Sequence, residues 1–181
     1  MTTMERPTAP AEQDLKQPSP GSIIQRLLRE HRRWRSKDFP LIAHLFDEVG
    51  YTDSDQPPCL APLRSAFHRL YAEMEGHMNR EEQVLFPAIL EAQTEVPKSF
   101  GSIRNPIGMV EQEHDWETER LEKMREIARD YQLPEDADAK LRLLFRELEA
   151  LEAAMHAHTR LESSILFARA LANEKASKPA A

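Results

Sequence analysis

The chain has 181 residues and a formal net charge of -7, a length that suits one domain with tails. Its acidic balance and lack of long Lys or Arg runs argue against nucleic acid or an anionic membrane surface as partner, and its one cysteine, Cys59, excludes an internal disulfide and a cysteine-held iron–sulfur cluster. No signal-like N-terminus or membrane-length apolar run is present, so we expect a cytoplasmic location without membrane contact.

The first predicted element follows a Pro-rich polar segment, residues 1–20, that we expect to be a disordered tail. A helix is predicted from about Ile23 to Val49, with Ser22 as its N-cap and a kink or local break at Pro40. Its expected inner stripe is Ile24, Leu27, His31, Trp34, Asp38, Leu41 and Leu45.

Three further helices are predicted along the rest of the chain, over about 63–92, 107–131 and from Asp136 or Asp138 to Asn173. The second helix has an expected stripe of Leu63, Phe67, Leu70, Met74, His77, Glu81, Val84 and Ala88. The third has Ile107, Val110, His114, Glu117, Leu121, Met124, Ala128 and Tyr131. The fourth has Leu141, Leu144, Leu148, Leu151, Met155, His158, Glu162 and Ile165.

Four long amphipathic segments joined by short connections, without strand-like alternation, predict an all-α protein. The expected architecture is an up-down-up-down four-helix bundle over residues 21–173. Residues 174–181 are expected to be a polar C-terminal tail.

A repeated His-x-x-x-Glu spacing marks the candidate functional residues. His77 and Glu81 form one copy, and His158 and Glu162 form the second. Residues four apart on a helix share a face, so each copy can direct one imidazole and one carboxylate to the same inner spot. Buried carboxylates are usually paired or bound to metal. The two remaining stripes carry one histidine each, which gives a predicted metal-ligand set of His31, His77, Glu81, His114, His158 and Glu162.

Six such ligands are too many for one tetrahedral zinc ion. They suit two octahedral-type ions, each held by two histidines and bridged by Glu81 and Glu162, with a solvent-derived oxide or hydroxide between them. Glu113, Asp115 and Glu117 are expected to orient ligands, with a direct ligand role for Glu117 left open, and His44 is expected on a helix surface. A structural His–Glu network without metal is the alternative.

The motifs that carry this pattern are similar to those of a known family. The pieces are His31, the run from His77 to Pro87, Glu113-His114-Asp115, and the run from His158 to Ala170. Together they resemble the hemerythrin-like (HHE cation-binding) domain, and within it most of all the di-iron domain of the iron–sulfur cluster repair proteins. The resemblance covers about residues 23–172 and implies a bundle with two iron ions.

The resemblance also implies a function in the response to nitric oxide or oxidative stress, with iron donation to damaged clusters as a further role. The implied partners are a small gaseous ligand and iron–sulfur proteins. Reversible oxygen binding, storage or sensing is the alternative. Two family features differ here: Thr118 stands where oxygen carriers have a fifth histidine, and Tyr51 and Asp53 stand where repair proteins tend to have another. Repair proteins also carry an N-terminal domain with cysteine, whereas a Pro-rich segment precedes the bundle here.

Overall fold

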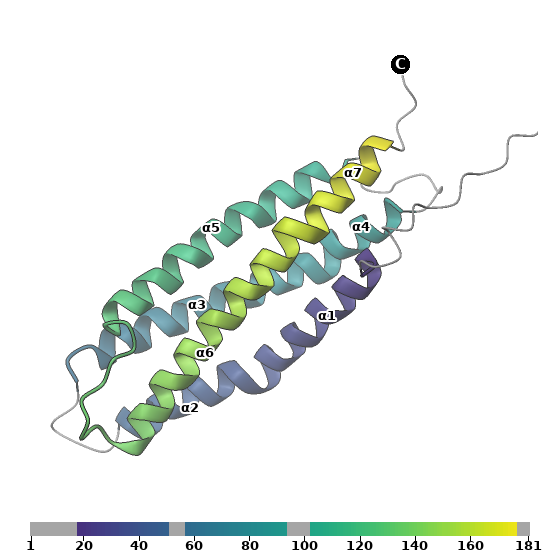
Figure 1. Cartoon of the computed structure of the whole chain (residues 1–181). Coiled ribbons are helices and arrows are strands. Elements are labelled where there is room, and N and C mark those ends of the chain that lie inside the picture. The colour runs from purple at the N-terminus through teal and green to yellow at the C-terminus, as the bar shows by residue number, and fades with distance from the viewer. Residues whose placement is uncertain (1–17, 51–56, 94–101, 177–181) are drawn as a thin grey trace, which may run out of the picture.

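Four long helical rods make up the protein, as a computed structural model of residues 18–50, 57–93 and 102–176 describes it (Figure 1). The first rod contains α1 (Pro20–Arg33), the π-helical segment η2 (Trp34–Asp38) and α2 (Phe39–Gly50). The second contains α3 (Leu60–Arg80), η3 (Glu81–Leu85) and α4 (Phe86–Glu91). The third is α5 (Arg104–Ile127), and the fourth contains α6 (Ala139–Leu161), η4 (Glu162–Phe167) and α7 (Ala168–Ala176).

The rods pack side by side as a four-helix bundle, and no strand occurs within the described ranges. The main lateral contacts pair α2 with α6, α3 with α5, and α1 with α4. Figure 1 shows α1, α4 and α7 at one end of the bundle and α2 at the other. The predicted all-α fold is therefore confirmed. No helix in the described part of the chain is long and apolar enough to cross a membrane.

The helix starts follow local capping chemistry. At the first helix the N-cap is Ser19 rather than the predicted Ser22, and the Ser19 hydroxyl accepts a hydrogen bond from the Ser22 backbone N–H at 3.2 Å. Pro20 takes the first helical position, where its missing N–H costs nothing. At α6 the N-cap is Asp138, one of the two predicted residues, and its carboxylate accepts from the Lys140 N–H.

Three π-helical segments change the predicted inner stripes. Each segment adds one residue to a turn, so the inner face moves by one position beyond it. After Glu81, Leu85 is buried while the predicted Val84 is 40% exposed. After Glu162, Leu166 is buried while the predicted Ile165 is 37% exposed. In the first rod, Phe39 is fully buried, and the predicted Asp38 and Leu41 are only partly buried.

Prolines account for two of these segments. Pro40 and Pro87 each lie two residues beyond a π segment, and each is the second residue of the α-helix that follows. A proline inside an α-helix lacks an N–H and meets the carbonyl four residues earlier. The π turn bypasses this conflict because the next N–H bonds five residues back, from Phe39 to Trp34 and from Phe86 to Glu81. The break expected at Pro40 therefore lies just before it, and Pro87 leaves α4 to continue to Glu91.

The apolar core is divided into two clusters. One contains Trp34, Phe67, Met74, Leu121 and Met155, together with neighbouring apolar residues toward the α2 end of the bundle. The other contains Ile24, Leu27, Leu85, Ile107 and Leu166 toward the α7 end. The candidate residues stand between the two clusters along the second and fourth rods: His77 and Glu81 lie between Met74 and Leu85, and His158 and Glu162 lie between Met155 and Leu166. A buried polar layer therefore separates the two apolar clusters.

Candidate metal centre

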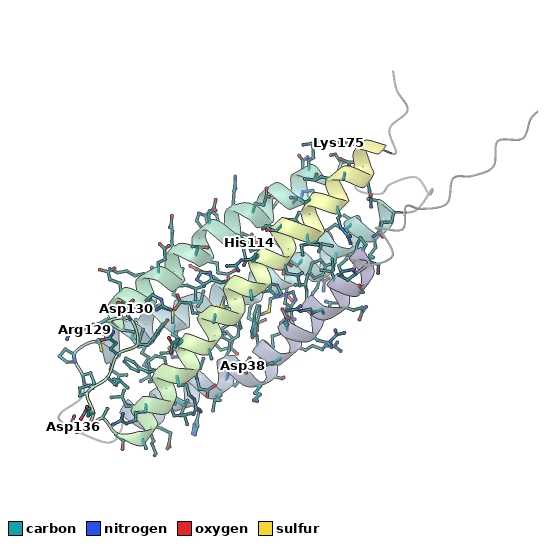
Figure 2. All side chains as sticks on the ribbon, viewed as in Figure 1. Asp38, His114, Arg129, Asp130, Asp136 and Lys175 are labelled. Carbon is teal, nitrogen blue, oxygen red and sulfur yellow. The ribbon has the colours of Figure 1, made fainter. Side chains whose placement is uncertain are left out.

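The six predicted ligand residues come together in one buried layer, to which all four rods contribute. Their exposed fractions range from 0% to 5%. Figure 2 labels His114 about midway along the bundle. Both glutamates occupy the first position of a π segment, so the extra residue in each helix lies next to the layer. The side chains come from α1 (His31), α3 (His77), η3 (Glu81), α5 (His114), α6 (His158) and η4 (Glu162).

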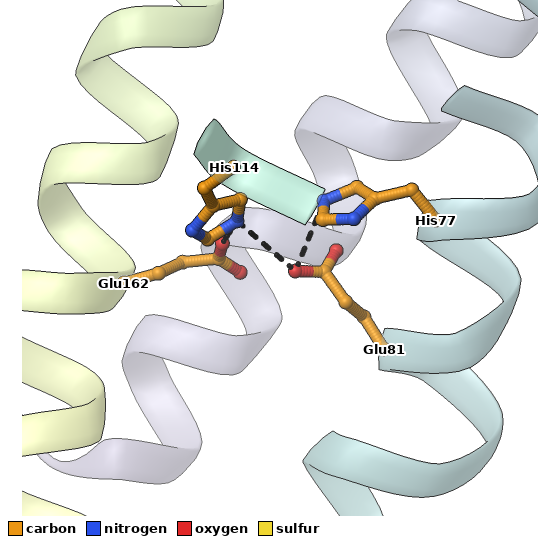
Figure 3. A group of neighbouring side chains, drawn as sticks. All are labelled: His77, Glu81, His114 and Glu162. Atoms are coloured by element: carbon orange, nitrogen blue, oxygen red, sulfur yellow. Dashed lines mark ion pairs between the residues drawn. The ribbon is translucent and has the colours of Figure 1, made fainter. Parts of the chain in front are cut away.

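Each glutamate reaches two histidines with its two oxygens. Glu81 places Oε2 3.1 Å from His31 Nε2 and Oε1 3.3 Å from His77 Nε2. Glu162 places Oε2 3.1 Å from His114 Nε2 and Oε1 3.5 Å from His158 Nε2 (Figure 3 draws His77, Glu81, His114 and Glu162). The Nε2 atoms of His31 and His158 are 3.3 Å apart. The layer thus has two halves, His31 with His158 and His77 with His114, spanned by both carboxylates.

The inner atoms of this layer are left without hydrogen-bond partners. In the described part of the chain, the buried side-chain atoms lacking one are His77 Nε2, His114 Nε2, and both oxygens of Glu81 and of Glu162. Buried polar atoms are nearly always satisfied, so a cluster of orphaned donor atoms calls for an explanation. Imidazole nitrogens and carboxylate oxygens within 4.8 Å of one another are a ligand set for transition metals. The residues therefore fit a metal centre better than a structural hydrogen-bond network.

The outer nitrogens of the histidines are held by acidic side chains. Three Nδ1 atoms lie within 3.0 Å of a carboxylate: His31 with Glu82, His158 with Glu30, and His77 with Glu113. His114 differs, because its Nδ1 lies 3.5 Å from the Ser163 hydroxyl. A carboxylate on the outer nitrogen fixes ring orientation and strengthens the inner nitrogen as a ligand.

The outer carboxylates are fixed in turn by arginines. Arg35 donates to Glu82 at 2.6 Å, and Arg26 donates to Glu30 at 2.9 Å. The Arg80 side chain pairs with Glu113. The hydrogen bond with His158 lowers the pKa of Glu30 to about 2, against the effect of burial. Each of these three glutamates is therefore positioned as a fixed acceptor.

The carboxylates of Glu81 and Glu162 have opposite ionisation preferences. Burial raises the pKa of Glu162 well above its usual value, and the nearby Glu81 carboxylate raises it further. Burial acts in the same direction on Glu81, but the charge of His77 and the close approach of His31 Nε2, at 3.1 Å, outweigh it and lower the Glu81 pKa. Two carboxylates enclosed together cannot easily both carry charge without a cation. The pair is thus an environment that favours cation binding.

Burial and neighbouring charges also shift the pKa values of groups in the His77–His114 half. Burial lowers the pKa of His114 to about 4, assisted by the charge of His77. Burial also opposes protonation of His77, yet the carboxylates of Glu81 and Glu113 raise its pKa. Glu117 is 8% exposed, and burial raises its pKa to about 7. A neutral His114 has a free lone pair, the form in which imidazole binds metal.

A pocket of about 330 Å³ between α3 and α5 reaches this half of the layer. Its wall includes Met74, Trp116 and the Arg80–Glu113 pair, and its lining extends to His77 and Glu117. Trp116 is 58% exposed. The His77–His114 half therefore adjoins a route from the surface.

Some residues considered at the sequence level lie away from the layer. His44 and Asp115 are exposed. Tyr51 and Asp53 lie outside the described residues. Glu113 has the orienting position expected of it, and Glu117 is buried near His77. Thr118, in the place of a fifth histidine, donates its hydroxyl to the His114 carbonyl at 2.9 Å.

The sequence interpretation missed Glu30, Glu82 and Ser163. A signal for each was present, because each residue directly neighbours a predicted ligand in the sequence. Each one contacts a histidine on another helix rather than the ligand beside it.

Comparisons with known proteins agree with this arrangement. The family model for the hemerythrin HHE cation binding domain matches residues 22–170. The chain is 31% identical to the iron-sulfur cluster repair protein YtfE of Cronobacter sakazakii, over 92% of this chain and 72% of that protein. It is 30% identical to the protein of the same name from Escherichia coli, over 91% and 72%, and 29% identical to that from Dickeya chrysanthemi, over 90% and 71%. The family match reaches all four rods and includes every residue of the buried polar layer, so the chain belongs to the hemerythrin HHE cation-binding family.

Proposed function

We propose that the polar layer holds two iron ions. His31 and His158 would hold one ion, His77 and His114 the other, and Glu81 and Glu162 would bridge them. The observation that carries this proposal is the set of orphaned inner atoms, all on side chains of this layer. An oxide or hydroxide bridge between the ions remains a prediction.

We propose further that the chain acts in the repair of iron–sulfur clusters, as a protein that holds iron and delivers it to damaged cluster proteins. Relatives at about 30% identity bear the name iron-sulfur cluster repair protein, which supports this role. Bound iron would supply redox chemistry and a source of iron. The chain's own residues orient the ligands through Glu30, Glu82 and Glu113, and the two apolar clusters limit access by water.

A response to nitric oxide or oxidative stress belongs to the same proposal, since a site with two histidines at each position leaves room for a small ligand. Reversible oxygen binding is the competing function. The Thr118 hydroxyl donates a hydrogen bond to the His114 carbonyl, and a threonine at this position supplies no fifth imidazole. The geometry therefore favours iron delivery over oxygen carriage.

Metal analysis tests the site. Anaerobic loading with ferrous iron should give two irons per chain, while Glu81→Gln and Glu162→Gln should each lose at least one. Glu149→Gln, an exposed position on α6, is the matched control and should keep both. Two irons retained in both bridge variants would reject the assignment.

The reaction is tested on the loaded protein. Incubation with an iron-depleted cluster protein and a sulfide source should restore cluster absorption faster than an equal amount of free iron. Exposure to oxygen should oxidise the site without a stable, reversible adduct. A reversible oxygen adduct with no iron transfer would favour the oxygen-binding function instead.

A further inference from the structure

The two halves of the metal layer have different surroundings. Trp34 stacks near both rings of one half, 6.0 Å from His31 and 4.7 Å from His158 between ring centroids, whereas in the other half Phe167 stacks on His114 alone, at 6.1 Å. The His31 side chain is completely buried. Neither His31 nor His158 is among the residues that line the 330 Å³ pocket between α3 and α5. This half of the layer therefore lies away from that pocket.

The His77–His114 half is more open. His77 lines the 330 Å³ pocket between α3 and α5, so one histidine ring of this half borders a pocket, although its Nε2 atom is itself buried. Glu117 and Glu113 line the same pocket and present carboxylates beside that approach. This pocket therefore borders one half of the layer, at His77, and not the half of His31 and His158.

The histidine rings of the two halves also differ in how firmly their outer nitrogens are held. Loss of a metal ion requires at least one ligand ring to turn away. His31 and His158 are both held at Nδ1 by carboxylates, at 2.9 and 2.8 Å, and those carboxylates are held by arginines. At its Nδ1 atom, His114 has only the Ser163 hydroxyl, at 3.5 Å, the upper limit for a hydrogen bond. Of the four rings, His114 is thus the least restrained.

We infer that the metal position held by His77 and His114 is the exchangeable one, and that Ser163 sets its rate of release through His114. This inference rests on the proposed function, because it assumes that the layer holds two metal ions. Iron delivered in repair then leaves from the pocket side, while the ion at His31 and His158 stays and keeps the layer assembled. Ser163 is a positioning residue in this scheme: a hydroxyl permits release where a carboxylate would prevent it.

Chelation kinetics on the full chain test the inference. Protein loaded anaerobically with two ferrous ions is mixed with excess ferrozine, and the ferrous complex is followed by absorbance. We expect two phases of one ion each. Ser163→Asp supplies a carboxylate to His114 and should slow the fast phase about tenfold or more, since partners of this kind change metal affinity by about 10–100-fold. Ser164→Asp adds the same charge at an exposed neighbouring position and should change neither phase.

A second variant tests the half formed by His31 and His158. Glu30→Gln weakens the acceptor for His158 and should accelerate only the slow phase, by a similar factor. Glu30→Gln also tests the inference if Ser163→Asp does not fold. Circular dichroism shows whether each variant has the helix content of the wild type. Release of both ions in a single phase, or an effect of Ser163→Asp on the slow phase alone, would overturn the inference. A chain that never takes up two ions would instead reject the proposed function itself.

Discussion

The Nδ1 atom of His158 lies 2.8 Å from a carboxylate oxygen of Glu30, a residue 128 positions earlier in the chain. Glu30 is the sequence neighbour of His31, whose own Nδ1 is held by Glu82. Glu113, the neighbour of His114, holds His77 on α3. Each of these three glutamates contacts a histidine on another helix, so the buried polar layer is complete only when the four rods are packed.

Removal of metal should therefore destabilise the whole bundle. A ligand that binds only the folded state adds about 4 kcal/mol when its free concentration is roughly 1,000 times Kd. We expect calorimetry to show one unfolding transition whose Tm falls when the metal is chelated. Glu162→Gln, which lacks a bridging carboxylate, should show a smaller fall. The same Tm with and without metal would contradict the interlocked arrangement.

The register change at η3 predicts that truncating two adjacent residues lowers the free energy of unfolding by very different amounts. Leu85 is 1% exposed, whereas Val84 is 40% exposed. Leu85→Ala should lower the free energy of unfolding by about 2–5 kcal/mol through lost burial and a cavity. Val84→Ala should change it by less than about 1 kcal/mol. Urea denaturation of the two variants decides the matter, and a larger loss at Val84 would refute the π-helical register.

Glu152 on α6 holds the turn that follows α5. It is 4% exposed and accepts hydrogen bonds from Tyr131 at 2.7 Å and Arg125 at 2.9 Å. Tyr131 ends a run of three residues with positive φ, which is costly for side chains other than glycine. The bond to Glu152 holds that turn in place.

Loss of the Tyr131–Glu152 hydrogen bond should lower the stability of the protein without lowering its metal content. Tyr131→Phe should reduce the free energy of unfolding by about 1.5–3 kcal/mol, the usual range for a hydrogen bond to a charged group. Metal content should stay at the wild-type value, because Glu152 precedes His158 by roughly 9 Å along the helix at about 1.5 Å per residue. Chemical denaturation and metal analysis of one sample test both statements. A variant with unchanged stability would show that the turn does not depend on this bond.

Glu117 predicts a pH dependence for the metal-free protein. Burial raises its pKa from 4.5 to about 7, so between these values the unfolded chain loses a proton that the folded chain keeps. This residue therefore lowers stability as pH rises across that window, by on the order of 3 kcal/mol, and adds no further change above it. Glu117→Gln should remove that part of the fall and stabilise the metal-free protein at pH 8. The measurement is the unfolding free energy at pH 4.5, 6 and 8.

The exposed neighbour Glu119 provides the control for this experiment. Glu119→Gln should leave the wild-type pH profile unchanged, whereas the difference between wild type and Glu117→Gln should grow with pH. A constant difference between those two proteins at all three pH values would show that Glu117 ionises normally in the folded chain.

The helices and the ligand residue types follow from local pattern. His77 with Glu81 and His158 with Glu162 repeat one helical spacing, so the sequence is sufficient to place each pair on one inner face. Local pattern could not place Val84 or Ile165, because a π turn shifts the face by one residue without changing the apolar composition. Pro40 and Pro87 indicated an irregularity in each helix. The sequence did not indicate that the irregularity would be a π-helical segment just before each proline.

The sequence by itself determined that this protein is a four-helix bundle with one histidine on each inner face and a glutamate on two of them, because periodicity is a property of each helix alone. Only the tertiary structure decided which histidine faces which carboxylate. The contacts of Glu30, Glu82 and Glu113 cross between rods and depend on how each helix is rotated against its neighbour. The same packing left His114 with a serine and opened a pocket beside His77. That asymmetry arises between helices and therefore has no signature within any one of them.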